Sequence, residues 1–242
     1  MENELIITRE FIKTNYPIEN IVNIFNECFP NGAKLSEFPK IRPYLEKYNP
    51  NFKAIYSCFA GWLLKVLPVN ETPLELDSTN MQDAIIYNGN INIKSDVTLV
   101  NPQIYLTGTL KINGKLAVSG NGFISSYENG CVIADEINLS GYTFISASAR
   151  SKIINMHNES TIIDSVTANS INLYDNALIN NSVKVNILNF YGGGRISSIV
   201  DADEIYNNGG LIGGDVNTIK IENINGGRVA GKITYKRSDE HK

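Results

Sequence analysis

The chain has 242 residues, of which 43% are hydrophobic and 19% are charged, and its formal net charge is −4. This composition is typical of a folded globular protein and not of a disordered one. The small negative charge argues against general nucleic-acid binding. No window reaches the roughly eighteen uninterrupted apolar residues of a membrane span, and the first residues, MENELIITREF, lack the pattern of a secretory signal. We therefore expect a cytoplasmic protein without a membrane partner.

Cysteine and histidine are too sparse and too scattered to predict a reactive site. Cys28, Cys58 and Cys131 include no C-x-x-C pair, which favours buried, reduced thiols over a disulfide framework or a zinc site. His157 has no cysteine or aspartate at a recognisable ligand or nucleophile spacing, and His241 lies in the polar end of the chain. We expect no metal and no cofactor.

Residues 1–67 have the hydrophobic spacing of helices. Apolar residues recur at steps of three and four between Ile18 and Phe29, a shorter helix is expected within 40–48, and a third runs from Phe52 to Leu67 before Pro68. We predict a small α-helical domain. It contains the only tryptophan, Trp62, and many aromatic residues. These form its own core or its contact with the solenoid, or they bind a protein partner.

The stretch 68–83 is polar, contains Pro73 and is expected to be a linker. Apolar-polar-apolar triplets such as Ile91–Asn92–Ile93 begin near Ala84 and recur at steps of six or seven, so three of them would close one roughly triangular coil. Between residues 120 and 131 this register loosens, and the run SYENG predicts a loop that bulges from the wall of the coil.

From Ala134 onward the sequence repeats every seventeen residues. The apolar columns of this repeat are Ile137, Ile154, Ile171, Leu188 and Ile205; Leu139, Met156, Leu173 and Phe190, with Asn207 as an exception; and Ile145, Ile162, Ile179 and Ile196. Residues that tolerate left-handed backbone angles share one turn position: Gly141, Asn158, Asp175, Gly192 and Gly209. The repeat predicts a mostly β fold, a parallel β-helix (β-solenoid) of about seventeen residues per coil over 84–235, followed by a polar tail, 236–242. Near residue 215 the spacing shortens, and we expect Val216 to take the position of Ala202.

Outward positions of the repeat hold an asparagine column, Asn138, Asn155, Asn172 and Asn189. Stacking at the strand spacing lets each amide hydrogen-bond its neighbours, so the column is predicted to be a structural ladder. Tyr174 and Tyr191 stack at a neighbouring position. The alternative is that these residues together present a flat polar and aromatic surface to a ligand or a protein.

Carbohydrate-active β-helix enzymes need carboxylates that converge on one substrate bond. The best local cluster is Asp201, Asp203 and Glu204, within which Asp201 and Asp203 would be the acid and the base. Lys184, one repeat before Asp201, is instead expected to pair with it. We therefore predict no catalytic residues and no enzyme activity.

The triplets Ile137–Asn138–Leu139 and Ile171–Asn172–Leu173 belong to a region, 85–233, whose architecture resembles that of the bactofilins, a family of polymer-forming cytoskeletal proteins. The resemblance implies self-assembly as one function. Bactofilins have short, mostly disordered tails around the solenoid, whereas this chain begins with an aromatic helical domain. We expect that domain to cover the first coil and the protein to be a monomer or small homo-oligomer.

Together these patterns predict a non-enzymatic protein-interaction or scaffold protein that uses the solenoid as a rigid platform. A more specific version is an inhibitor of a larger host assembly. The alternatives are a carbohydrate-active β-helix enzyme and a self-assembling, bactofilin-like structural protein. The partner is expected to be a protein, and the expected binding residues are Trp62, Tyr174 and Tyr191.

Overall fold

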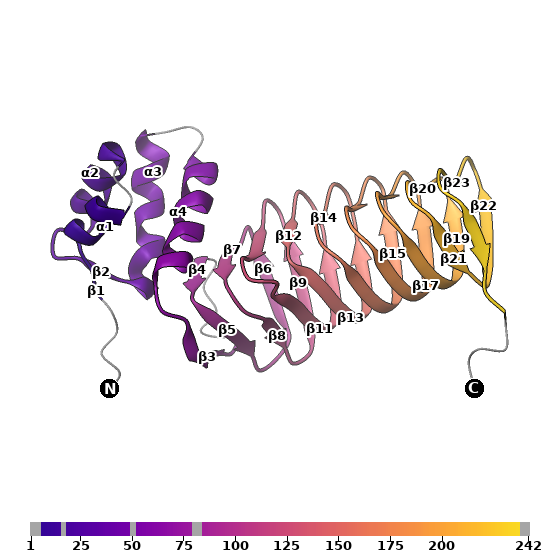
Figure 1. The fold of residues 1–242 in the computed structure, drawn as a ribbon, viewed down its shortest axis with the longest axis horizontal. Coiled ribbons are helices and arrows are strands. Elements are labelled where there is room, and N and C mark those ends of the chain that lie inside the picture. The colour runs from indigo at the N-terminus through magenta and orange to yellow at the C-terminus, as the bar shows by residue number, and fades with distance from the viewer. Residues whose placement is uncertain (1–5, 16–17, 49–51, 79–83, 238–242) are drawn as a thin grey trace.

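Figure 1 shows a computed structural model of the chain, a rod of stacked strands with helices at one end. The structure describes residues 6–15, 18–48, 52–78 and 84–237. The rod is a parallel β-solenoid of about nine coils, which confirms the predicted fold class. None of the described helices is both long enough and apolar enough to cross a membrane.

The N-terminal helical unit follows the predicted helices closely and adds elements that the sequence analysis did not resolve. Its elements are β1 (Ile6–Ile7), α1 (Arg9–Asn15), α2 (Glu19–Cys28), β2 (Ala33–Lys34), the 3-10 helix η1 (Leu35–Ile41), α3 (Arg42–Tyr48) and α4 (Phe52–Val66). In α2, Ile21, Val22, Ile24 and Phe25 are buried, as the spacing predicted. Strands β1 and β2 form a small antiparallel pair.

The solenoid is built from two parallel sheets that share the same coils. The nine-stranded sheet contains β4 (Ala84–Tyr87), β7 (Gln103–Leu106), β10 (Phe123–Ser126), β12 (Phe144–Ser146), β14 (Thr161–Ile162), β16 (Leu178–Ile179), β18 (Arg195–Ile196), β20 (Leu211–Ile212) and β23 (Arg228–Val229). The thirteen-stranded sheet contains β3 (Asn70–Leu76), β5 (Gly89–Ile93), β6 (Val97–Val100), β8 (Leu110–Ile112), β9 (Lys115–Ser119), β11 (Cys131–Leu139), β13 (Ser148–Met156), β15 (Val166–Tyr174), β17 (Val183–Tyr191), β19 (Val200–Asn208), β21 (Val216–Thr218), β22 (Lys220–Ile224) and β24 (Ile233–Tyr235).

Each long strand of the larger sheet bends once. In β11 the buried residues Val132 and Ala134 are followed by two outward residues before burial resumes at Ile137 and Leu139. Alternation therefore changes phase at Asp135, because a flat strand would bury every second residue. This bend gives each coil two faces from the larger sheet, and the nine-stranded sheet supplies the third.

One continuous hydrophobic core runs along the rod. Its most regular column is the inward side of the nine-stranded sheet, in which neighbouring residues pair from coil to coil: Ile85, Ile104, Ile124, Ile145, Ile162, Ile179, Ile196, Ile212 and Val229. Because each coil buries its aliphatic residues against the next, the stability of the rod depends on contacts between neighbouring coils.

The predicted turn column is confirmed by the backbone. All five of its residues have positive φ: Gly141 (75°), Asn158 (58°), Asp175 (53°), Gly192 (137°) and Gly209 (85°). Asn and Asp tolerate this left-handed conformation better than other residues with a side chain, and glycine adopts it without strain. Asp175 also accepts a hydrogen bond from the backbone N–H of Asn158, one coil away, at 3.0 Å.

The helical unit packs against the side of the first coils. Its core includes Ile86 of β4 and Tyr105 of β7, whose side chains point outward from the solenoid. The loop within SYENG supplies Tyr127, whose ring lies directly over Gly61 of α4. The side-chain amide of Asn88 also donates to the carbonyl oxygen of Leu67 at 2.6 Å. The loop expected between 120 and 131 therefore connects the two units.

Several details of the chain differ from the sequence-based expectations. The cysteines were expected to be buried, but Cys58 is exposed and Cys28 and Cys131 are only partly buried. The expected linker, 68–83, contains β3, which pairs with β5, so the solenoid begins before Ala84; residues 79–83 lie outside the described part. Val216 pairs with Val200 and not with Ala202, because that coil is shortened by one residue only. Of the expected polar tail, 236–242, only residues 236 and 237 are described.

Candidate functional site

The asparagine column forms the predicted ladder. Asn155 donates to Asn138 at 2.8 Å, Asn172 to Asn155 at 2.7 Å, and Asn189 to Asn172 at 2.9 Å, each from the side-chain Nδ2 to the next Oδ1. The chain of bonds ends at Glu136, whose Oε1 accepts from Asn138 at 2.9 Å. Each amide thus keeps one N–H hydrogen and part of its acceptor capacity for another molecule.

An aromatic stack lies beside this ladder at the turn. The rings of His157 and Tyr174 are 4.2 Å apart between centroids at an angle of 7°, and those of Tyr174 and Tyr191 are 4.7 Å apart at 12°. Tyr191 is 50% exposed. The two tyrosines were predicted as binding residues. His157 was considered only as a metal ligand or nucleophile and was rejected for both roles, although it lies seventeen residues before Tyr174.

Aliphatic side chains border the asparagine ladder on its other side. Ile153 and Ile187 share one column with Ser170 between them, and both isoleucines are 40% exposed. We name the whole surface the ladder face and define it by Ile153, Asn155, His157, Ser170, Asn172, Tyr174, Ile187, Asn189 and Tyr191. These residues come from β13, β15 and β17, apart from His157, which follows β13 directly.

The ladder face contains no Asp, Glu, Lys or Arg, and charged groups enclose it at both ends. Towards the N-terminus, Glu136 pairs with Lys115 at 3.0 Å. Hydrogen bonds from Asn138 and Lys115 hold the pKa of Glu136 below its usual range. Towards the C-terminus, Lys220 pairs with Glu222 at 2.7 Å. The ladder face itself, on β13, β15 and β17, is uncharged.

Tyr206 continues the asparagine column beyond the ladder face. Its hydroxyl donates to the carboxylate of Glu204, and this bond raises the pKa of Tyr206. The Nζ atom of Lys220 lies 5.0 Å from the centre of the Tyr206 ring. Tyr206 therefore contacts both Glu204 and Lys220 at this end of the ladder face.

Trp62, the third predicted binding residue, lies in the helical unit and not on the ladder face. Its ring is parallel to that of Phe59 at 5.4 Å and tilted against that of Phe11 at 6.0 Å. The indole is partly buried against the core of the helical unit. The structure therefore brings Tyr174 and Tyr191 together and leaves Trp62 separate from them.

The candidate catalytic carboxylates are joined by a lysine. The Nζ atom of Lys236 lies 2.6 Å from Oδ1 of Asp201 and 3.2 Å from Oδ1 of Asp203. Burial alone would lower the pKa of Lys236. Its bonds to the two carboxylates raise the pKa by a larger amount, so the pKa lies above its ordinary value. Lys184 is the register neighbour of Asp201, as expected, but the ion pair that the structure gives to Asp201 is with Lys236.

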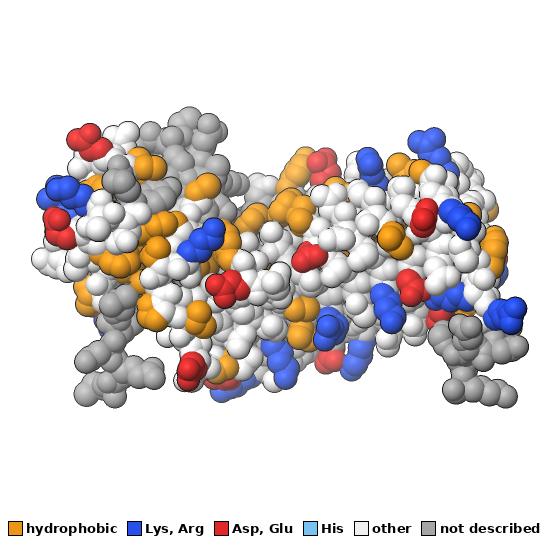
Figure 2. Space-filling view, in the orientation of Figure 1, with side chains coloured by type: hydrophobic (Ala, Val, Ile, Leu, Met, Phe, Trp, Pro, Cys, Tyr) orange, Lys and Arg blue, Asp and Glu red, His pale blue; other side chains and the backbone are white. Residues whose placement is uncertain are grey.

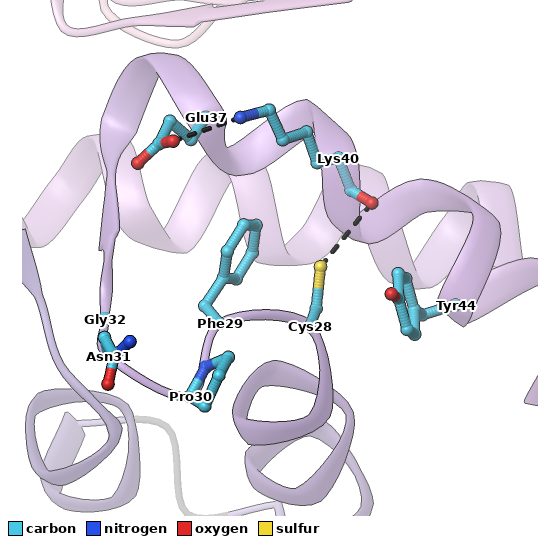
Figure 3. A pocket seen from close by; sticks show the side chains of 8 residues that line it. All are labelled: Cys28, Phe29, Pro30, Asn31, Gly32, Glu37, Lys40 and Tyr44. Atoms are coloured by element: carbon cyan, nitrogen blue, oxygen red, sulfur yellow. Dashed lines mark hydrogen bonds and ion pairs between the residues drawn. The ribbon is translucent and has the colours of Figure 1, made fainter.

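Figure 3 shows a pocket of about 320 Å³ in the helical unit, lined by Cys28, Phe29, Pro30, Asn31, Gly32, Glu37, Lys40 and Tyr44. Its charged groups bind one another, since Lys40 pairs with Glu37 at 3.0 Å. The Cys28 thiol donates to the Lys40 carbonyl oxygen at 3.6 Å, and burial raises its pKa. A raised thiol pKa disfavours the reactive thiolate. The pocket is therefore a weaker candidate for the functional site than the ladder face.

No protein-family model, curated protein or solved structure matches this chain. The resemblance to bactofilins thus extends to the solenoid architecture alone. Among the described residues, no group of three or more His, Cys, Asp and Glu side chains is arranged to hold a metal ion. The ladder face presents side-chain amides, stacked aromatic rings and exposed aliphatic groups.

Proposed function

We propose that this protein is a non-enzymatic protein-interaction platform and that the ladder face binds its protein partner. The observation that carries the proposal is the uncharged patch on β13, β15 and β17, in which exposed Tyr191, Ile153 and Ile187 surround the asparagine ladder. Charged residues are depleted and tyrosine is enriched in the centres of protein interfaces.

The strand pairing beneath the ladder face, and the contacts among its side chains, favour tight binding of a partner. Strand β15 is paired on both sides, by β13 and by β17, and each ladder asparagine is held by its neighbours. The stacked rings restrict one another in the same way. Binding to such a surface costs little conformational entropy, because its side chains are already ordered.

Two observations make the enzyme alternative less attractive. The carboxylates of Asp201 and Asp203 share Lys236, whose ammonium group would oppose the proton uptake that a catalytic base requires. They also lie on β19 and outside the ladder face.

The test compares two isoleucine-to-arginine variants of the full chain. Ile187→Arg places a charge in the ladder face, whereas Ile199→Arg is a matched control, because Ile199 is 55% exposed at a different corner of the coil. Affinity capture from the native host, followed by a binding measurement with the purified partner, should show loss of binding by about tenfold or more for Ile187→Arg alone. If both variants retain the same partners and affinities as the natural chain, the ladder face is not the binding surface.

A further inference from the structure

The outer side of the nine-stranded sheet carries a second patterned surface. Outward residues that pair from coil to coil form one column: Phe123, Phe144, Thr161, Leu178, Arg195, Leu211 and Arg228. Its last four members alternate leucine and arginine, and we name them the Leu–Arg column. They belong to β16, β18, β20 and β23, in the C-terminal half of the rod.

The guanidinium groups of these two arginines have no protein partner within the described part of the chain. Both side chains are exposed, and neither forms a hydrogen bond or an ion pair with a described residue. Leu178 and Leu211 are half-buried and keep part of their apolar surface open. Figure 2 shows basic and hydrophobic side chains alternating along the upper edge of the rod, where Figure 1 labels β20 and β23.

The same sheet already binds helices near its other end. Tyr105 lies in the core of the helical unit, and its ring is 5.5 Å from that of Phe123. Phe123 in turn stacks on Phe144 at 5.4 Å and 8°. The surface that the helical unit covers therefore continues into the Leu–Arg column without leaving the sheet.

The spacing of the column suits a helix better than a strand. Neighbouring coils are about 4.8 Å apart, so the column presents an alternating leucine and arginine at steps of that size. An α-helix lying along the rod offers one side chain per turn at about 5.4 Å, and it stays close to register over three steps. A strand offers side chains on one face only every 6.6–6.8 Å or so, and it loses register after one or two steps.

We propose that the Leu–Arg column binds an acidic amphipathic helix of a partner protein, lying along the C-terminal half of the rod on the same sheet that the helical unit covers near its other end. Apolar side chains of that helix pack on Leu178 and Leu211, and carboxylates at the alternate turns pair with Arg195 and Arg228. The planar guanidinium group binds a carboxylate through two parallel hydrogen bonds, which a lysine cannot do. This surface is separate from the ladder face, so the proposal does not depend on the proposed function.

The experiment measures binding of a synthetic peptide to the full chain by fluorescence anisotropy. The peptide has about 18 residues, long enough to span the column, with leucine and glutamate at alternate turns of one helical face. Two control peptides have the same length: one replaces glutamate by lysine, and the other keeps the leucines and glutamates of that face but has proline at central positions elsewhere, which prevents a helix. The protein variants are Arg195→Glu/Arg228→Glu and, as a control of equal charge change on another face, Arg150→Glu/Lys184→Glu.

The acidic helical peptide should bind the natural chain and the control variant, and Arg195→Glu/Arg228→Glu should weaken binding by about tenfold or more. Circular dichroism should show that the peptide gains helix on binding. Failure of this peptide to bind, or equal binding by the charge-reversal variant, would overturn the proposal. Equal binding of the proline peptide would also overturn it, because an unstructured acidic chain would then suffice. Unchanged melting of both variants shows that the effects are not due to unfolding.

Discussion

The side-chain oxygen of Asn207 accepts a hydrogen bond from the backbone N–H of Gly210 at 2.9 Å, inside the solenoid core. Asn207 is fully buried in a column that is apolar in the four preceding coils. Its Nδ2 donates to Asn223 at 2.9 Å. The apolar column therefore ends at Asn207, one coil before the end of the described rod. The buried amide of Asn207 forms hydrogen bonds through both its nitrogen and its oxygen.

Asn207→Ala should lower the free energy of unfolding by about 1–3 kcal/mol, because the buried N–H of Gly210 loses its acceptor. Chemical denaturation measures this value. Asn217→Ala is the control, since Asn217 is exposed and should change stability by no more than about 0.5 kcal/mol. Equal effects of the two substitutions would contradict the role assigned to Asn207.

Ser160→Ala should leave stability unchanged or raise it by about 1 kcal/mol. The hydroxyl of Ser160 is buried and has no hydrogen-bond partner among the described residues, and a buried unpaired hydroxyl is costly. The next coil carries Ala177 in the equivalent place. Thr218→Val provides the contrast and should destabilise, because the Thr218 hydroxyl lies 3.0 Å from the Asp203 carbonyl oxygen. A clear loss of stability in Ser160→Ala would count against this account.

Gly61→Ala should act in opposite directions in two backgrounds. In the natural chain an added Cβ would lie 2.6 Å from the Tyr127 ring, so the substitution should destabilise despite the better helix propensity of alanine. In Tyr127→Ala the obstruction is gone, and Gly61→Ala should stabilise by about 1 kcal/mol. Thermal unfolding of the natural chain, the two single variants and the double variant gives the four stabilities of this double-mutant cycle. Identical effects in both backgrounds would mean that Tyr127 does not connect the helical unit to the rod.

Lys236→Gln should loosen β24 without unfolding the rod. The substitution removes the ion pairs with Asp201 and Asp203, which hold the residue after β24 to a strand two coils away. Hydrogen exchange at pH 8 should accelerate for the amides of 233–236 and stay constant in β15. Uniform protection in both proteins would show that the lysine does not secure this strand.

The stabilisation by Lys236 should also depend on pH in a defined direction. Folding raises its pKa, so its contribution is complete below the ordinary lysine value of about 10.4 and is lost as the pH rises through the folded value. The difference in melting temperature between the natural chain and Lys236→Gln should therefore be constant from pH 7 to 9 and shrink above about pH 10.5. A difference that grows above that pH would contradict the sign.

The seventeen-residue columns predicted the coil, its core and its turns, because each buried position recurs in every coil. Ile171 and Ile179, for example, are completely buried as expected. Contacts outside the repeat were not predictable in the same way. Strand β3 was missed because Pro73 and its polar neighbours resemble a linker, and edge strands tolerate proline. The position of Tyr127 over Gly61 depends on how two units pack, for which neither residue carries a local signal.

The candidate site was predictable in part for the same reason. Tyr174, Tyr191 and the asparagines recur at the repeat spacing, and the structure places them on one face. His157 has the same spacing, but it was considered only as a metal ligand or nucleophile and not as a member of this surface. Lys236 reaches Asp203 from 33 residues away, at an end of the chain where the repeat no longer fixes the neighbours.

The regular pairing of β15 with β17 also makes the length of the rod adjustable. Duplication of residues 166–182 would add seventeen residues and keep every inward column in register, because each new strand would find the same neighbours. The added coil would move β24 away from the helical unit by about 4.8 Å while leaving both unchanged. A chain of this kind can therefore set the separation between its two ends in whole-coil increments.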